Sequence, residues 1–270
     1  MAAIDPMHQF LIHKIVEFPP VQIGGFALDL SITNAVVTMM AGALIICGFF
    51  LMSARRQIVP GRMQALSESL YGLIDGVLVG PIMGHNGRPY IPFVFTIFMM
   101  VLTFNMMGIW LAVGNLGGLD LTFTVTAQLA CTVALALLTF ISVIVIGFLK
   151  NGLKFFGLFV PKGVPIAILP MMVLIEFISF MVRPLTLSMR LFGNMIGGHV
   201  VMYMFASFVV SLGAFALGGH ILGWPLSGIS LFMVVALTGL EMIVAFLQAF
   251  VFAALACVYL NEVVNFGHGH

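Results

Sequence analysis

Long apolar stretches recur along the chain, and three in its first half contain no charged residue. Residues 31–54, 90–119 and 121–149 hold no Asp, Glu, Lys or Arg. A helix needs about 20 apolar residues to cross the hydrocarbon core, and only helices and closed barrels satisfy their backbone there. The alternation of polar and apolar residues typical of barrel strands is absent. The pattern therefore predicts three membrane-spanning helices in this half.

The second half is almost free of charge. Beyond Lys162, three ionisable residues precede residues 191–240, a stretch with no charge at all; these three are Glu176, Arg183 and Arg190. Such a stretch is too long for a single crossing and must turn once. The Gly- and Pro-bearing segment LGGHILGWPLSG, residues 217–228, is the expected turn. Two long helices on either side of it bring the expected number of spans to five.

Residues 60–80 show a different periodicity, with apolar residues on one side of a helix. The polar Gln64, Glu68 and Asp75 fall on the opposite side, and the apolar residues at helical spacing are Met63, Leu66, Leu70, Leu73 and Val77. We expect this amphipathic helix to lie along the membrane surface. A short sixth span is the alternative, but the charges at Arg62, Glu68 and Asp75 make full insertion costly.

These patterns together predict the fold class and the division of the chain. We expect an all-α polytopic membrane protein with about five transmembrane helices, one interfacial amphipathic helix, and two long, tilted final helices. The expected segments are an N-terminal outer-side segment 1–30, a first span 31–54, the interfacial helix 60–80, a hairpin 90–149, a long hairpin 163–262 and a tail 263–270.

The short loops give an orientation, because Lys and Arg favour the cytoplasmic side. The cations follow the first and third spans, at Arg55, Arg56, Arg62, Lys150, Lys154 and Lys162, whereas the loops after the second and fourth spans have none. This bias places the N-terminus outside and the C-terminus inside. Residues 1–20 lack the basic and continuous apolar regions of a signal peptide, so we expect the first span to be retained.

Composition excludes several classes of function. The 270 residues are 62% hydrophobic and 7% charged, with a mean hydropathy of +1.21, far outside the range of soluble domains. A net charge of +1 offers no basic patch for a nucleic-acid partner. Cys47, Cys131 and Cys257 each lie in apolar runs and are interpreted as buried hydrophobes. The sequence contains no phosphate-binding glycine loop, metal-ligand cluster or nucleophile triad.

Two polar stripes stand out against the apolar background of the last two helices. The first joins Glu176, Arg183, Arg190 and Asn194, whose directions agree within about 40° on a helix. The second joins Glu241, Gln248 and Tyr259, which agree within about 20°. Pro184 makes the first alignment approximate because it can kink the helix.

The stripes have a structural and a functional interpretation. In the structural one, Glu176 pairs with Arg183 and Arg190 pairs with Glu241 as buried ion pairs. We favour transport, because ionisable residues at membrane depth are costly and mark ion pathways. Arginine keeps its proton in almost any site, whereas Glu, His and Tyr can exchange one, so the residue types predict a fixed cation flanked by proton-conducting groups.

The residues alone do not decide the roles of two further features, His199 and a group of three glycines. His199 projects to the opposite side of the helix from Arg190, so packing and proton relay are equally plausible for it. Gly193, Gly197 and Gly198 allow close helix packing, either within this chain or against a partner subunit.

Two runs carry a resemblance to a known family. RPLTLSMRLFGNMIGGH (183–199) and EMIVAFLQAFVFAALACVYL (241–260) resemble the paired signature helices of F-type ATP synthase subunit a. The N-terminal PMHQF, the surface segment and the number of spans also resemble bacterial members of that family. The resemblance implies a stator subunit that couples proton flow through two offset half-channels to rotation of a ring of c subunits.

The resemblance also implies a role for each polar position. Arg190 matches the essential arginine that separates the half-channels and favours the ionised ring carboxylate. The outer half-channel positions are Asn194, His199, Glu241 and Gln248, and the inner ones are Glu176, Arg183 and Tyr259. Some relatives exchange the acid and the base at the positions of His199 and Glu241.

Partners and location follow from the same resemblance. We expect the c ring, peripheral-stalk b-type subunits and membrane lipid as partners, no nucleic acid, no nucleotide bound by this chain, no cofactor and no catalysis by the chain alone. The expected location is a bacterial inner membrane, with a mitochondrial inner membrane as the alternative. A secondary transporter would need repeated halves, and a haem subunit would need more axial ligands than His199 offers at membrane depth.

Overall fold

Long helices make up most of the described chain. The computed structural model describes residues 14–16, 21–23, 26–28, 31–54, 60–113, 124–160, 165 and 168–265. Within these residues, five helical stretches are long and apolar enough to cross a membrane: Asn34–Ser53, Arg62–Ile109, Leu129–Asn151, Leu169–Leu217 and Gly223–Val264. The prediction of an all-α polytopic membrane protein with five spans is confirmed.

Four short strands precede the first helix and were not predicted. β1 (Lys14–Val16) pairs antiparallel with β4 (Ile32–Thr33), and β2 (Val21–Ile23) pairs with β3 (Phe26–Leu28). Each strand has three residues or fewer, so none carries enough alternation to be recognised from its pattern. The rest of the expected N-terminal segment 1–30 lies outside the described residues.

The first span, α1 (Asn34–Ser53), is followed by one helical run of changing type. This run comprises α2 (Arg62–Leu73), the π-helix η2 (Ile74–Val79), α3 (Gly80–Met83), the 3₁₀ helix η3 (Gly84–Tyr90) and α4 (Ile91–Val113). Gly84 has a φ of 62°, a left-handed conformation that glycine adopts without steric cost, and it marks the change of direction. Residues 114–119 of the expected second span lie outside the described residues.

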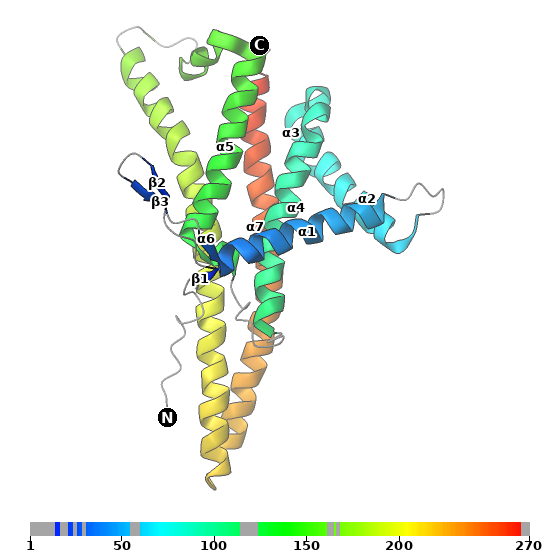
Figure 1. Ribbon diagram of the computed structural model, residues 1–270, viewed down its shortest axis with the longest axis vertical. Coiled ribbons are helices and arrows are strands. Elements are labelled where there is room, and N and C mark those ends of the chain that lie inside the picture. The colour runs from blue at the N-terminus through cyan, green and yellow to red at the C-terminus, as the bar shows by residue number, and fades with distance from the viewer. Residues whose placement is uncertain are drawn as a thin grey trace. The chain divides into compact units, whose positions relative to one another are not determined.

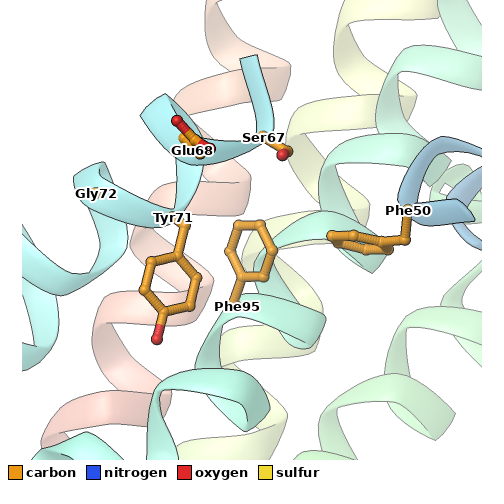
Figure 2. A pocket seen from close by; sticks show the side chains of 6 residues that line it. All are labelled: Phe50, Ser67, Glu68, Tyr71, Gly72 and Phe95. Atoms are coloured by element: carbon orange, nitrogen blue, oxygen red, sulfur yellow. The ribbon is translucent and has the colours of Figure 1, made fainter. Parts of the chain in front are cut away.

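α2 lies where the amphipathic helix was expected, and it contains no buried residue. Met63, Leu66 and Val77 of the expected apolar face are 42%, 49% and 51% exposed. A recess of about 290 Å³ lies beside α2, lined by Phe50, Ser67, Glu68, Tyr71, Gly72 and Phe95. Figure 2 shows the rings of Phe50 and Tyr71 on either side of Phe95, and each meets the Phe95 ring edge to face at 5.6 Å. Aromatic packing thus joins the end of α1, α2 and the start of α4.

The third span, α5 (Leu129–Asn151), follows the short 3₁₀ helix η4 (Val125–Ala127) and leads into η5 (Gly152–Phe159). Gly147 brings α5 close to the last helix, because a Cβ atom there would lie 2.3 Å from Val263 Cγ1. The Asn151 side-chain amide donates a 2.6 Å hydrogen bond to the Val263 carbonyl. This end of α5 is therefore held against the C-terminal helix.

The last two helices are the longest, α6 (Leu169–Leu217) and α7 (Gly223–Val264). α6 continues through Pro184. The turn between the helices occupies residues 218–222 and is shorter than the expected 217–228, because α7 already begins at Gly223. Pro225 falls in the first turn of α7, where its missing N–H is no loss. α7 also ends at Val264, beyond the expected boundary at residue 262.

The chain divides into two compact units, and α6 and α7 contribute to both. The first unit comprises residues 1–44, 102–128 and 191–247, and the second comprises 45–101, 129–190 and 248–270. In the first unit α6 and α7 form an antiparallel hairpin (Figure 1), whose register is marked by a Ser227 hydroxyl bonded to the Val209 carbonyl at 3.2 Å. One cluster of buried apolar residues in this unit consists of Ile109, Ala127, Met195 and Ala245.

Candidate functional site

A buried acid and a buried base face each other within the first unit. His199 lies on α6 and Glu241 lies on α7, with Nε2 and Oε1 3.5 Å apart. Their side chains are only 1% and 5% exposed. Within the described residues, neither carboxylate oxygen of Glu241 has a hydrogen-bond partner. Ionisable groups buried in apolar surroundings are costly, so this pair within two apolar helices is the candidate functional site.

Glycine makes room for this pair between the two helices. A Cβ atom at Gly198 would lie 2.9 Å from Glu241 Oε1 and 3.3 Å from its Cδ. The carboxyl group therefore lies directly against the α6 backbone, where any larger residue would displace it. Gly198 therefore allows close packing between two helices of this chain, which is one of the two explanations that the sequence analysis considered for it.

The pair borders a recess of about 270 Å³, lined by Asn194, Gly197, Gly198, Val201, Leu237, Leu240, Glu241 and Val244. Asn194 is exposed and is one of the polar residues that line this recess. Three of the four expected outer half-channel residues, Asn194, His199 and Glu241, are thus brought together in the first unit. The fourth, Gln248, belongs to the second unit, where it is 4% exposed.

A second polar cluster centres on Arg183 in the second unit. Its guanidinium donates a hydrogen bond to Glu262, and it lies 3.8 Å from Glu176 Oε1. The same group lies 4.8 Å from the Tyr259 ring centroid and 5.5 Å from that of Phe180. All three expected inner positions, Glu176, Arg183 and Tyr259, therefore meet at one cluster. Arginine can contact all of these groups at once, because its planar cation pairs with carboxylates and stacks on aromatic faces.

Arg190 differs from Arg183 in its contacts, although it interacts electrostatically with Tyr259 of the Arg183 cluster. It is exposed, and within the described residues it makes no ion pair. This position leaves its guanidinium available to a group outside the chain.

Two polar contacts were missed by the sequence analysis. Glu262, bonded to Arg183, continues the seven-residue spacing of Glu241 and Gln248, so the spacing could have found it. Thr124, whose hydroxyl lies 3.0 Å from His199 Nε2, gave no such signal, because it precedes η4 and lies in neither long helix.

Comparison with known proteins decides the family. A family model described as ATP synthase A chain matches residues 35–261, which include the His199–Glu241 pair and all of the Arg183 cluster except Glu262. This chain belongs to the ATP synthase A chain family. Proteins named ATP synthase subunit a are similar along almost their whole length: 47% identical in Rhizobium johnstonii and 46% in Agrobacterium fabrum, covering 98% of this chain and 99% and 100% of those relatives. The protein of that name in Chelativorans sp. is 45% identical, over 98% of this chain and 100% of its own length.

As a member of the ATP synthase A chain family with five apolar spans, the chain is a multi-pass membrane protein. Its clusters contain carboxyl, imidazole, phenol and amide groups, which can exchange protons or hold water. Within the described residues, no group of three His, Cys, Asp or Glu side chains is placed to hold a metal ion. Membership of the ATP synthase A chain family supports a proton-translocating subunit of the ATP synthase membrane sector.

Proposed function

We propose that this chain is the proton-translocating stator subunit of a rotary ATP synthase, with two offset half-channels that serve a ring of c subunits. The observation that carries the proposal is the buried pair His199 and Glu241, 3.5 Å apart between two long apolar helices. Membership of the ATP synthase A chain family supplies the context for that pair. A purely structural ion pair would gain little there, because desolvation offsets much of the attraction between buried charges.

The outer half-channel uses Asn194, His199, Glu241 and Gln248. Asn194 and Glu241 line one recess, which supports a path for water and protons to the buried pair. His199 and Glu241 exchange the proton between them, because imidazole and carboxyl groups can each hold it in turn. From Glu241 the proton passes to a carboxylate on the ring.

The inner half-channel uses Glu176, Arg183 and Tyr259, together with Glu262. The Arg183 guanidinium holds the carboxylates Glu176 and Glu262 close to the ring of Tyr259, which supports a hydrated exit lined by acceptors. Protons that leave the c ring are released along these groups.

Arg190 is the fixed cation between the two paths. Its exposed guanidinium favours the ionised form of each ring carboxylate that passes, and it keeps its proton throughout. A permanent cation also repels protons and so blocks a direct leak between the half-channels. The partners are the c ring and b-type stalk subunits, in a bacterial inner membrane with the N-terminus periplasmic and the C-terminus cytoplasmic.

Proton uptake by the reconstituted complex tests this function. Glu241→Gln keeps the shape of the side chain and removes its acid, so the initial rate of proton-driven ATP synthesis should fall by about a hundredfold or more, the scale of a lost acid–base group. His199→Leu should have a similar effect. Glu68→Gln is the matched control, because Glu68 lies on exposed α2 outside the hairpin. Unchanged proton flux in both Glu241→Gln and His199→Leu would refute the proposed path.

A further inference from the structure

A threonine from outside the two signature helices reaches the buried pair. Thr124 immediately precedes η4 and is 3% exposed. Its Oγ1 lies 3.0 Å from His199 Nε2, within ordinary hydrogen-bond distance. The loop segment before α5 therefore contributes a side chain to the site formed by α6 and α7.

The two neighbours of His199 share one ring nitrogen. Nε2 faces the Thr124 hydroxyl at 3.0 Å and Glu241 Oε1 at 3.5 Å. A hydroxyl group can donate one hydrogen bond and accept others at the same time. Thr124 can therefore give a proton to Nε2 and accept its replacement from water, whereas an apolar side chain of the same shape could do neither.

Local packing fixes the position of this hydroxyl. A Cβ atom at Gly108 of α4 would lie 2.4 Å from Thr124 Cγ2 and 2.7 Å from its Oγ1. The α4 backbone is thus in direct contact with the threonine side chain, and only glycine leaves the space. A β-branched side chain is already stiff at χ1, so this contact holds Oγ1 toward His199.

We propose that Thr124 is a proton-relay residue that passes protons to His199; this inference rests on the proposed function. A hydronium ion gives a proton to Thr124 Oγ1 and becomes water as the hydroxyl proton passes to the unprotonated Nε2, so the hydroxyl is regenerated and His199 becomes imidazolium. Nε2 then gives that proton to the Glu241 carboxylate, which restores neutral imidazole and leaves a carboxylic acid. Each step moves one proton, and no other reactant is needed.

The test is the dependence of proton flux on external pH in vesicles that contain the whole reconstituted ATP synthase. Thr124→Val keeps the branched shape and removes only the hydroxyl. We expect the external proton concentration for half-maximal flux to rise by about threefold to tenfold, the range of one neutral hydrogen bond. Thr124→Ser keeps the hydroxyl and should remain close to the unmodified protein.

A matched control lies two residues further along. Thr126 is 1% exposed, and within the described residues its hydroxyl has no hydrogen-bond partner. Thr126→Val should therefore leave the pH dependence unchanged. Gly108→Ala should displace the Thr124 hydroxyl and imitate Thr124→Val, because its Cβ atom would lie 2.7 Å from Oγ1.

Two results would overturn the relay. One is an unshifted pH dependence in Thr124→Val. The other is an equal shift in Thr124→Ser, which would assign the effect to packing and not to the hydroxyl. Either result alongside an impaired Glu241→Gln variant leaves the proposed function in place. Normal flux in Glu241→Gln and His199→Leu would instead remove the proposed function, and the relay with it.

Discussion

At the scale of single residues, the site depends on which groups can hold a proton and how closely they approach. His199 and Glu241 are both almost fully buried, and the Gly198 backbone lies against the carboxyl group. Their side-chain types could exchange places, because each helix would still present one titratable group at the contact. The order of acid and base along the chain is therefore less important than their contact.

This reasoning predicts the outcome of a double exchange. His199→Glu and Glu241→His should each slow proton uptake, because each leaves two acids or two bases together. The two substitutions combined restore one of each and should recover more activity than either alone. The measurement is ATP synthesis driven by an imposed proton gradient in reconstituted vesicles. A double variant no better than the worse single variant would contradict the coupling of the pair.

The sequence predicted part of this site and not the rest, for physical reasons. An ionisable side chain at membrane depth costs free energy, so it stands out in an apolar sequence. This signal alone identified Glu176, Arg183, Arg190 and Glu241. Thr124 gives no such signal, because a threonine can lie in a membrane at little free-energy cost when its hydroxyl is hydrogen-bonded to a nearby backbone group. Its role depends on a tertiary contact with His199, which no spacing within one helix can reveal.

At the scale of helices, apolar length determined the number of spans but not their ends. The turn near residue 220 was located by glycine and proline, yet α7 begins at Gly223 because Pro225 is acceptable in a first helical turn. The unbroken run from α2 to α4 was not expected. Its π and 3₁₀ segments depend on local packing, such as the burial of Ile74, Leu78 and Val79, and not on residue periodicity.

Close packing between α5 and α7 gives a prediction about stability. Gly147→Ala would place a methyl group 2.3 Å from the Cγ1 of fully buried Val263, and neither helix can yield easily. Overpacking of this kind costs about 1–3 kcal/mol. Gly48→Ala in α1 is the control, since a Cβ atom there meets nothing within 4 Å. Thermal unfolding in detergent should show a lower midpoint for Gly147→Ala alone; equal midpoints would mean that the two helices are not tightly packed.

At the scale of the whole molecule, the loop charges predict a topology that fixes which half-channel opens to which side. Cysteine introduced at Arg62 or Lys154 should react with a membrane-impermeant thiol reagent only from the cytoplasmic side. Cysteine at His220, in the exposed turn between α6 and α7, should react only from outside. The background should lack Cys47, Cys131 and Cys257. The reverse labelling pattern would exchange the two half-channels.

In the proposed mechanism, Arg190 couples proton flow to rotation of the c ring. The residue is exposed and makes no ion pair within the described residues, so its removal should leave assembly largely intact. Arg190→Lys keeps the positive charge but loses the planar guanidinium group and its near-permanent protonation, so this variant should also fail to couple proton flow to ATP synthesis. Arg88→Ala, another exposed cation outside the hairpin, serves as the control.

The most direct measurement is ATP synthesis and passive proton flux by the Arg190→Ala complex in reconstituted vesicles. We predict that coupled synthesis is abolished, that the c ring still copurifies, and that passive proton permeability is unchanged or higher. Near-normal coupled synthesis by Arg190→Ala would contradict the proposed function.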